Sequence, residues 1–157
     1  MISETTAELI RITADNGLVV WDTGCFGQVL QKLPQPAAQF PGLIHFVGIA
    51  AKDKVLKKLF FHGGLGHDEW GPIYLHLNPL TVDNDSPVLI VDSNPFSELS
   101  SWTNCKLDRE ARPYQFRWPL LPTATPFDIL FGQLLLLFSD VILIFAQDFP
   151  KPPDIIS

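Results

Sequence analysis

The apolar residues of the chain gather in short runs, and their spacing separates strands from helices. Residues 43–49, LIHFVGI, are almost continuously apolar, as in a strand that a parallel sheet buries on both faces. Residues 53–60, DKVLKKLF, place apolar side chains at helical spacing between lysines. This succession predicts a buried strand followed by an amphipathic helix.

Four further elements continue the pattern. Residues 71–79 alternate enough for a strand, which we expect at a sheet edge, and residues 86–95 contain a second short apolar run. After an irregular stretch of about 93–123, residues 127–138 predict a helix that is apolar on nearly every face, and 140–146 a third buried strand. The order predicts an α/β fold with a mostly parallel sheet flanked by helices.

The first 39 residues have a different character. ELIRIT and LVVWD flank ADNG, whose Asn16-Gly17 pair suits a hairpin turn, and CFGQVLQKL follows as a short helix. A proline-rich stretch, PQPAAQFPG, then separates this part from the rest. The pattern predicts an N-terminal hairpin and short-helix appendage over 1–39 and an α/β domain over 40–157.

Composition narrows the class of protein. The chain has 157 residues, 46% apolar and 18% charged, with a net charge of −6, so it is globular and lacks the basic surface that nucleic-acid binding requires. Its two cysteines, Cys25 and Cys105, are far apart and suggest reduced thiols. No signal peptide and no membrane span is visible, and a cytoplasmic location is expected.

The stretch GIAAKDKV, residues 48–55, matches the phosphate-loop pattern G-x-x-x-x-G-K-[ST] at two positions. Gly48 takes the first position and Lys54 the lysine position. Asp53 replaces the second glycine, which adds a negative charge where backbone N–H groups would surround the phosphates. Val55 replaces the hydroxyl residue, so that magnesium loses a ligand. The pattern indicates a vestigial phosphate loop.

Two more residues stand where a nucleotide site would need them. Asp92 ends the apolar run PVLIVD, the position of a carboxylate that holds magnesium. Thr81 lies in NPLTVDNDS, where a switch-loop threonine would stand. Together with Gly48 and Lys54 they give the order loop, threonine, strand and carboxylate, which favours a P-loop architecture over another α/β topology.

This order resembles the front half of a GTPase domain of the dynamin-like or Ras-like class. FPGLIHFVG, IYLHLNPLTVDNDSPVLIVDSNP and LLLLFSDVILIFAQDF are also similar to a G-domain-like region of large fungal multidomain proteins, some of which carry patatin-type phospholipase domains. The resemblance covers roughly residues 40–149. It implies a P-loop NTPase-like fold, with GTP and Mg²⁺ as cofactors if the site is competent and none otherwise.

The chain departs from that family at several points. Asp92 is followed by SNP without the glycine of D-x-x-G, and no N-K-x-D segment for guanine is present. The sequence after 149 leads to the expectation of a partial G domain, incomplete at its C-terminus, whose open sheet edge a protein partner or a further domain completes.

Two rival sites are weaker. His62, His67, Asp68, Glu69 and His76 fit no metal-ligand spacing, and we expect a glycine-rich loop there. HGG at 62–64 occurs without a G-x-S-x-G nucleophile elbow, which argues against a lipase-type hydrolase. The sequence therefore favours a degenerate, catalytically inactive G-domain-like module acting in regulation or protein interaction. The alternative is a nucleotide-binding GTPase or NTPase with an atypical phosphate loop.

Overall fold

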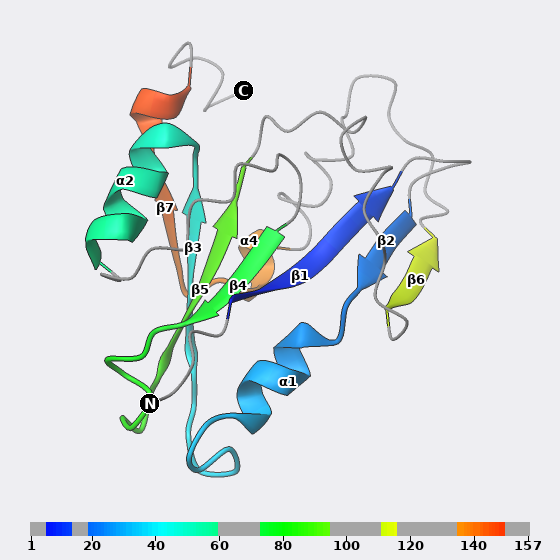
Figure 1. The fold of residues 1–157 in the computed structure, drawn as a ribbon, viewed down its shortest axis with the longest axis vertical. Coiled ribbons are helices and arrows are strands. Elements are labelled where there is room, and N and C mark those ends of the chain that lie inside the picture. Colours follow the sequence, from blue (N-terminus) through cyan, green and yellow to red (C-terminus); the bar gives the residue numbers. More distant parts are fainter. Residues whose placement is uncertain (1–5, 14–18, 60–72, 95–110, 116–134, 150–157) are drawn as a thin grey trace.

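A single seven-stranded sheet organises the part of the chain that the structure describes. The computed structural model describes residues 6–13, 19–59, 73–94, 111–115 and 135–149 (Figure 1). The strands follow the order β6-β2-β1-β4-β5-β3-β7 across the sheet. Their bounds are Thr6–Thr13 (β1), Val19–Asp22 (β2), Gly42–Val47 (β3), Ile73–Leu77 (β4), Val88–Ser93 (β5), Arg112–Gln115 (β6) and Val141–Ile144 (β7).

The sheet is mixed, so the α/β class is confirmed while the expectation of a mostly parallel sheet is wrong. Only β3 runs parallel to its neighbours, β5 and β7. The pairs β1–β2, β1–β4, β2–β6 and β4–β5 are antiparallel. The sequence pattern did not predict the mixed sheet, because it does not show that β4, β1, β2 and β6 join the sheet by antiparallel pairs on one side of β5. For the same reason β4 lies between β1 and β5 rather than at an edge.

The predicted N-terminal hairpin forms and belongs to this sheet. Thr13 of β1 stands opposite Val19 of β2, and the turn between them lies outside the described residues. The helix α1, Cys25–Gln31, follows as expected. It begins after Gly24, whose φ of 71° is a left-handed conformation that favours glycine. Strands β1 and β2 therefore belong to the same sheet as β3, β4, β5 and β7, joined to them through the pairing of β1 with β4.

Helices cover both faces of the sheet. On one face, α1 and the turn before α4, Leu136–Phe138, pack against the strands. The buried members of this cluster are Val20, Cys25, Val29, Leu33, Ile73, Leu75, Leu77, Val82, Leu89, Val91 and Leu135. On the other face, α2, Ala50–Leu59, packs Leu56 against Phe46 and Ile90. Burying these apolar surfaces is the main source of stability for such a fold.

The C-terminal half departs from the pattern in two places. The strand β6 lies inside the stretch expected to be irregular. The strand β7 was expected to be buried, but Val141, Leu143 and Ile144 are 46%, 41% and 49% exposed, because β7 is an edge strand. Of the helix expected at 127–138, only the end falls within the described residues, as α4. None of the described helices combines the length and apolarity needed to cross a membrane.

Candidate functional site

The connection between β3 and α2 is where the sequence predicts a phosphate loop. β3 ends at Val47, only Gly48 and Ile49 follow, and α2 begins at Ala50. The N–H of Asp53 already donates to the carbonyl of Ile49, 2.9 Å away, in a helical turn. A two-residue connection cannot wrap around a phosphate chain. Asp53, Lys54 and Val55 are consequently helical residues rather than loop residues.

Lys52 is the lysine that this connection directs into the fold. It stands one helical turn before Leu56, on the stripe of α2 that faces the sheet, and is only 4% exposed. Its ammonium forms an ion pair with the carboxylate of Asp92. It also lies 3.4 Å from the carbonyl oxygen of Ser93 and 3.5 Å from a carboxylate oxygen of Asp53. The charge of Lys52 is thus neutralised within the chain.

Asp92 meets Lys52 because of its position near the end of β5. It lies two residues after Ile90, so both side chains point to the sheet face that α2 covers, and Asp92 is 5% exposed. Its second oxygen lies 3.8 Å from Nε2 of His76 on β4. Burial acts to raise the pKa of Asp92, but the imidazole of His76 and the ammonium of Lys52 outweigh it and lower that pKa. Asp92 is therefore held as a carboxylate.

Asp53 completes this buried group from the helix side. Its side chain is partly exposed, and burial raises its pKa although Lys52 acts to lower it. Two carboxylates thus share the one ammonium of Lys52. We call Lys52, Asp53, His76 and Asp92 the polar cluster under α2.

A third carboxylate binds the beginning of α2 from above. Asp148 lies in the short turn η3, Ala146–Asp148, which follows β7 and packs against α2 (Figure 1). Its carboxylate accepts the backbone N–H groups of Ile49 at 2.6 Å, Ala51 at 2.8 Å and Lys52 at 3.2 Å. Partial burial opposes the effect, but these hydrogen bonds hold the pKa of Asp148 below its usual value.

This arrangement, which we call the Asp148 cap, uses the anion-binding property of a helix start. The first N–H groups of a helix have no partner within the helix, and the helix dipole places positive charge there. Phosphate groups bind such positions in nucleotide-binding proteins. Here a carboxylate from the same chain takes the N–H groups, so that an external anion would have to displace Asp148.

Gly48 is required by the Asp148 cap. A Cβ atom at this position would lie 2.6 Å from a carboxylate oxygen of Asp148, 3.0 Å from Cβ of Phe145 and 3.1 Å from Cβ of Lys52. Any other residue would therefore push the cap away from the helix. The glycine that resembles the first position of a phosphate loop makes room for an internal carboxylate.

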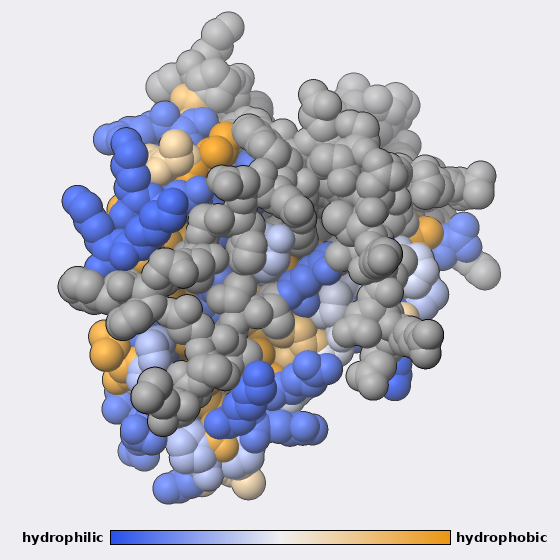
Figure 2. All heavy atoms as spheres, in the orientation of Figure 1, coloured by the Kyte–Doolittle hydropathy of each residue, from blue (hydrophilic) through white to orange (hydrophobic). Residues whose placement is uncertain are grey.

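The structure brings Gly48, Asp53 and Asp92 together and leaves the other predicted site residues apart. Lys54 is exposed on α2, and Val55 packs beside the apolar cluster of Phe46, Leu56 and Ile90. With Lys57 and Lys58, Lys54 forms a hydrophilic surface over this helix (Figure 2). The lysines of α2 are thus divided, since Lys52 is buried while Lys54, Lys57 and Lys58 face solvent.

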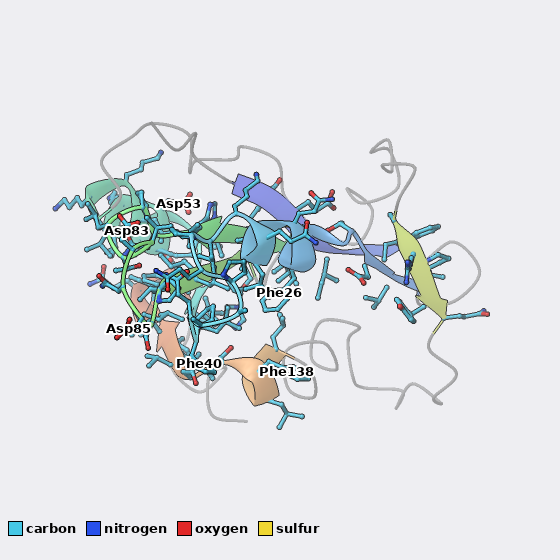
Figure 3. All side chains as sticks on the ribbon, turned by 90° about the horizontal axis from the view of Figure 1, so that it is seen from below. Phe26, Phe40, Asp53, Asp83, Asp85 and Phe138 are labelled. Atoms are coloured by element: carbon cyan, nitrogen blue, oxygen red, sulfur yellow. The ribbon has the colours of Figure 1, made fainter. Side chains whose placement is uncertain are left out.

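Thr81 lies at the opposite end of the sheet. Its hydroxyl accepts the N–H of Val88, the first residue of β5, at 2.9 Å and donates to the carbonyl of Asn78 at 3.1 Å. Since β5 runs parallel to β3, this turn is about one strand length, roughly 17 Å, from Gly48. Asp83 and Asp85 lie on the same turn (Figure 3). Thr81 shapes the β4–β5 turn and does not reach the polar cluster under α2.

A Ser–His pair lies on the other face of the same strands. Nε2 of His45 is 2.6 Å from the hydroxyl oxygen of Ser93, and both side chains are fully buried. Burial lowers the pKa of His45 to about 4, with Asp92 acting in the opposite direction. A neutral imidazole and a hydroxyl at hydrogen-bond distance resemble a nucleophile and its base. Their burial gives a substrate no access, so the pair is a structural element.

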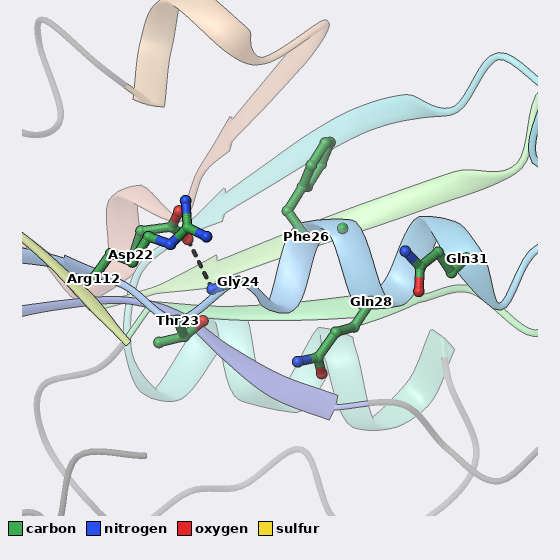
Figure 4. A pocket seen from close by; sticks show the side chains of 8 residues that line it. Asp22, Thr23, Gly24, Phe26, Gln28, Gln31 and Arg112 are labelled. Atoms are coloured by element: carbon green, nitrogen blue, oxygen red, sulfur yellow. Dashed lines mark hydrogen bonds between the residues drawn. The ribbon is translucent and has the colours of Figure 1, made fainter. Parts of the chain in front are cut away.

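One open pocket lies away from these groups, between α1 and β6 (Figure 4). It has a volume of about 650 Å³ and is lined by Asp22, Thr23, Gly24, Phe26, Gly27, Gln28, Gln31 and Arg112. Asp22 and Arg112 are register partners on β2 and β6, and Asp22 accepts the N–H of Gly24 at 2.8 Å. Its lining side chains are mostly exposed, so the pocket indicates no particular ligand.

Two residues that matter here were missed by the sequence pattern, although each had a signal. Lys52 stands four residues before Leu56 on the apolar stripe of the helix, where a lysine is unusual and needs a buried partner. Asp148 follows a strand whose carboxyl end meets that of β3 at one edge of the sheet. A carboxylate just after such a strand is able to reach the helix that follows β3.

Among the described residues no three His, Cys, Asp or Glu side chains converge as a metal site would require. His62, His67, Asp68 and Glu69 lie outside the described part, while His76 belongs to the polar cluster under α2. Comparisons with protein-family models, with curated proteins and with solved structures give no match to this chain. The functional argument therefore rests on the geometry around α2.

Proposed function

We propose that this chain is a degenerate, P-loop G-domain-like module that does not hydrolyse nucleotide and acts in regulation or protein interaction. The single observation that carries the proposal is the Asp148 cap. In a phosphate-binding domain the strand–loop–helix unit offers its N–H groups to phosphate. Here Ile49, Ala51 and Lys52 offer theirs to the carboxylate of Asp148.

The polar cluster under α2 supports the proposal independently. A phosphate-site lysine must be free to contact phosphate, and the strand carboxylate must be free to hold magnesium. Lys52 and Asp92 neutralise one another in a buried ion pair. Separating them would leave each charge without its main partner in the interior, which is costly. The lysine and the carboxylate that a nucleotide site would need are thereby bound to one another and stabilise the fold.

A second candidate function rests on the same pair. Lys52 lies in the first turn of α2 and Asp92 near the carboxyl end of β5, where a nucleotide site would bring a lysine and a magnesium carboxylate together. A GTPase or NTPase with an atypical loop would then bind GTP and Mg²⁺ after the Asp148 cap opens. This function requires a ligand that replaces both the cap and the ion pair.

Calorimetric titration of the full chain with GTP, GDP and ATP, each with and without Mg²⁺, separates the two functions. The proposal expects no binding heat with any of the six combinations. Magnesium-dependent binding that Lys52→Ala abolishes and Lys54→Ala leaves intact would establish the second candidate instead. The Lys54→Ala control removes a charge from the same helix but leaves the ion pair untouched.

A further inference from the structure

The two edges of the sheet are built differently. At one edge, β6 has the sequence RPYQ, in which Arg112 carries a charge and Pro113 lacks an N–H. Charged residues and proline are the usual means by which an edge strand avoids pairing with another chain. At the other edge, β7 has the sequence VILI and contains neither. The described sheet thus has one protected edge and one unprotected edge (Figure 1).

The β7 edge is regular as well as apolar. Val141 to Ile144 pair in unbroken parallel register with Ile44 to Val47 of β3, so no bulge turns the strand away. No described strand pairs with the outer side of β7. The outward backbone N–H and C=O groups of such an edge are a template on which another strand is able to pair.

We infer that β7 is a self-association surface, on which β7 of a second copy of this chain pairs in antiparallel orientation and joins two sheets across a two-fold axis. A two-fold axis between Ile142 and Leu143 places Val141 opposite Ile144 of the other copy and Ile142 opposite Leu143. All cross-strand pairs are then apolar, which is the favourable composition for strand pairing. A two-fold contact of this kind closes on itself and gives a dimer.

The exposed side chains of β7 supply part of the area that a dimer needs. Val141, Leu143 and Ile144 are exposed by two fifths or more. Their exposed parts amount to on the order of 250 Å², and the paired backbone adds to them, compared with about 800 Å² per partner in a standard interface.

The absence of charge on β7 allows a second copy as the occupant. Val141 to Ile144 carry no charge, so nothing repels the identical edge of another molecule, and nothing in the strand selects a different partner. The nearest acidic residue is Asp140, whose carboxylate accepts the N–H of Leu43 at 2.7 Å. In the proposed register Asp140 faces Phe145 of the other copy, and the two Asp140 residues stand roughly 17 Å apart.

This inference specifies the interaction surface of the proposed function and rests on that part of it. It does not depend on whether nucleotide binds. The calorimetric titration measures nucleotide binding, whereas the oligomeric state reports on the pairing of β7. A chain that binds no nucleotide and remains monomeric would therefore overturn the β7 inference alone.

Sedimentation equilibrium of the full chain over a range of concentrations tests the inference. We expect a monomer–dimer equilibrium, which salt strengthens because each chain carries a net charge of −6. Leu143→Lys should raise the dimer dissociation constant by about tenfold or more, since it buries a charge between the strands. Leu80→Lys is the matched control, because Leu80 is 78% exposed in the distant β4–β5 turn.

Hydrogen exchange in the same samples identifies the surface. Exchange at residues 141–144 should slow as the concentration rises, while exchange at β6 should not change. If Leu143→Lys does not fold, Val141→Lys provides the same charge at the start of β7. A monomer at every concentration would overturn the inference. So would a dimer that resists both lysine substitutions or leaves exchange in β7 unchanged.

Discussion

Helix α2 begins between two carboxylates that differ in depth. Below it, Asp92 is 5% exposed and forms an ion pair with a lysine that is equally inaccessible. Above it, Asp148 is partly exposed and binds only backbone N–H groups. Removing one partner of a buried ion pair costs several kcal/mol, whereas a helix cap contributes about 1 kcal/mol. The ion pair of Asp92 therefore contributes more to the stability of the fold. The Asp148 cap contributes less and occupies the N–H groups at the start of α2.

Breaking the lower contact should have the largest effect. Lys52→Met keeps the length of the side chain but leaves the buried carboxylate of Asp92 without its ammonium partner. We expect a loss of about 3–5 kcal/mol in the free energy of unfolding, measured by urea denaturation. Lys54→Met, on the exposed side of the same helix, should change this free energy by less than about 0.5 kcal/mol. Equal losses in both variants would show that the ion pair of Lys52 has no special role.

Lowering the pH should have the next largest effect on stability, through the buried His45 on the other face of the sheet. Burial keeps His45 neutral in the fold, with a pKa of about 4, compared with 6.5 in the unfolded chain. The unfolded state binds the proton more readily between these values, so stability is complete above pH 6.5 and falls as the pH drops toward 4. The expected loss attributable to His45 is about 3 kcal/mol.

Urea denaturation between these two pH values measures that loss. His45→Gln removes this titrating group, and its stability should no longer fall over the window; Asp53, whose pKa is raised in the fold, acts in the opposite direction there. The carboxylates of Asp92 and Asp148, whose pKa values are lowered in the fold, contribute stability that is lost only at still lower pH. An unchanged slope in the His45→Gln variant would assign the acid sensitivity to another group.

Disturbing the upper contact should have the smallest effect on stability. Asp148→Ala removes a helix cap and should cost about 1 kcal/mol. Gly48→Ala should cost about 1–3 kcal/mol, since its methyl group meets the cap at 2.6 Å. The double variant should lose less stability than the sum of the two single losses, because the methyl group at position 48 no longer meets a carboxylate at position 148. Strict additivity in urea denaturation would contradict the account of Gly48.

Much of the fold could be predicted from the sequence because apolar runs indicate strands directly. The hairpin, α1, β3, α2, β5 and the α/β class all follow from periodicity and turn residues. The order of strands could not be predicted, because pairing of β1 with β4 depends on contacts between residues distant in the sequence. The exposure of β7 was missed for the same reason, since an apolar run has the same sequence at the centre and at the edge of a sheet.

Gly48, Asp53 and Asp92 were singled out from the sequence, but the lysine that lies with them was not. Matching Gly48 to a phosphate loop required four loop residues before Asp53, whereas the helix begins at Ala50. The lysine that meets Asp92 is the buried Lys52 rather than the exposed Lys54. Asp148 was not considered because it lies almost a hundred residues further along the chain. A loop motif describes neighbours in sequence, and this site is formed by three separate segments.

Amide spectra of the wild-type chain and of Asp148→Ala, each titrated with inorganic pyrophosphate, test whether Asp148 keeps anions from the start of α2. Pyrophosphate is a small anion and needs only the N–H groups at the start of α2. We expect the signals of Ile49, Ala51 and Lys52 to remain unchanged in the wild type and to shift with pyrophosphate in Asp148→Ala. Signals that shift in the wild type at the same concentrations as in the variant would show that Asp148 does not close the site.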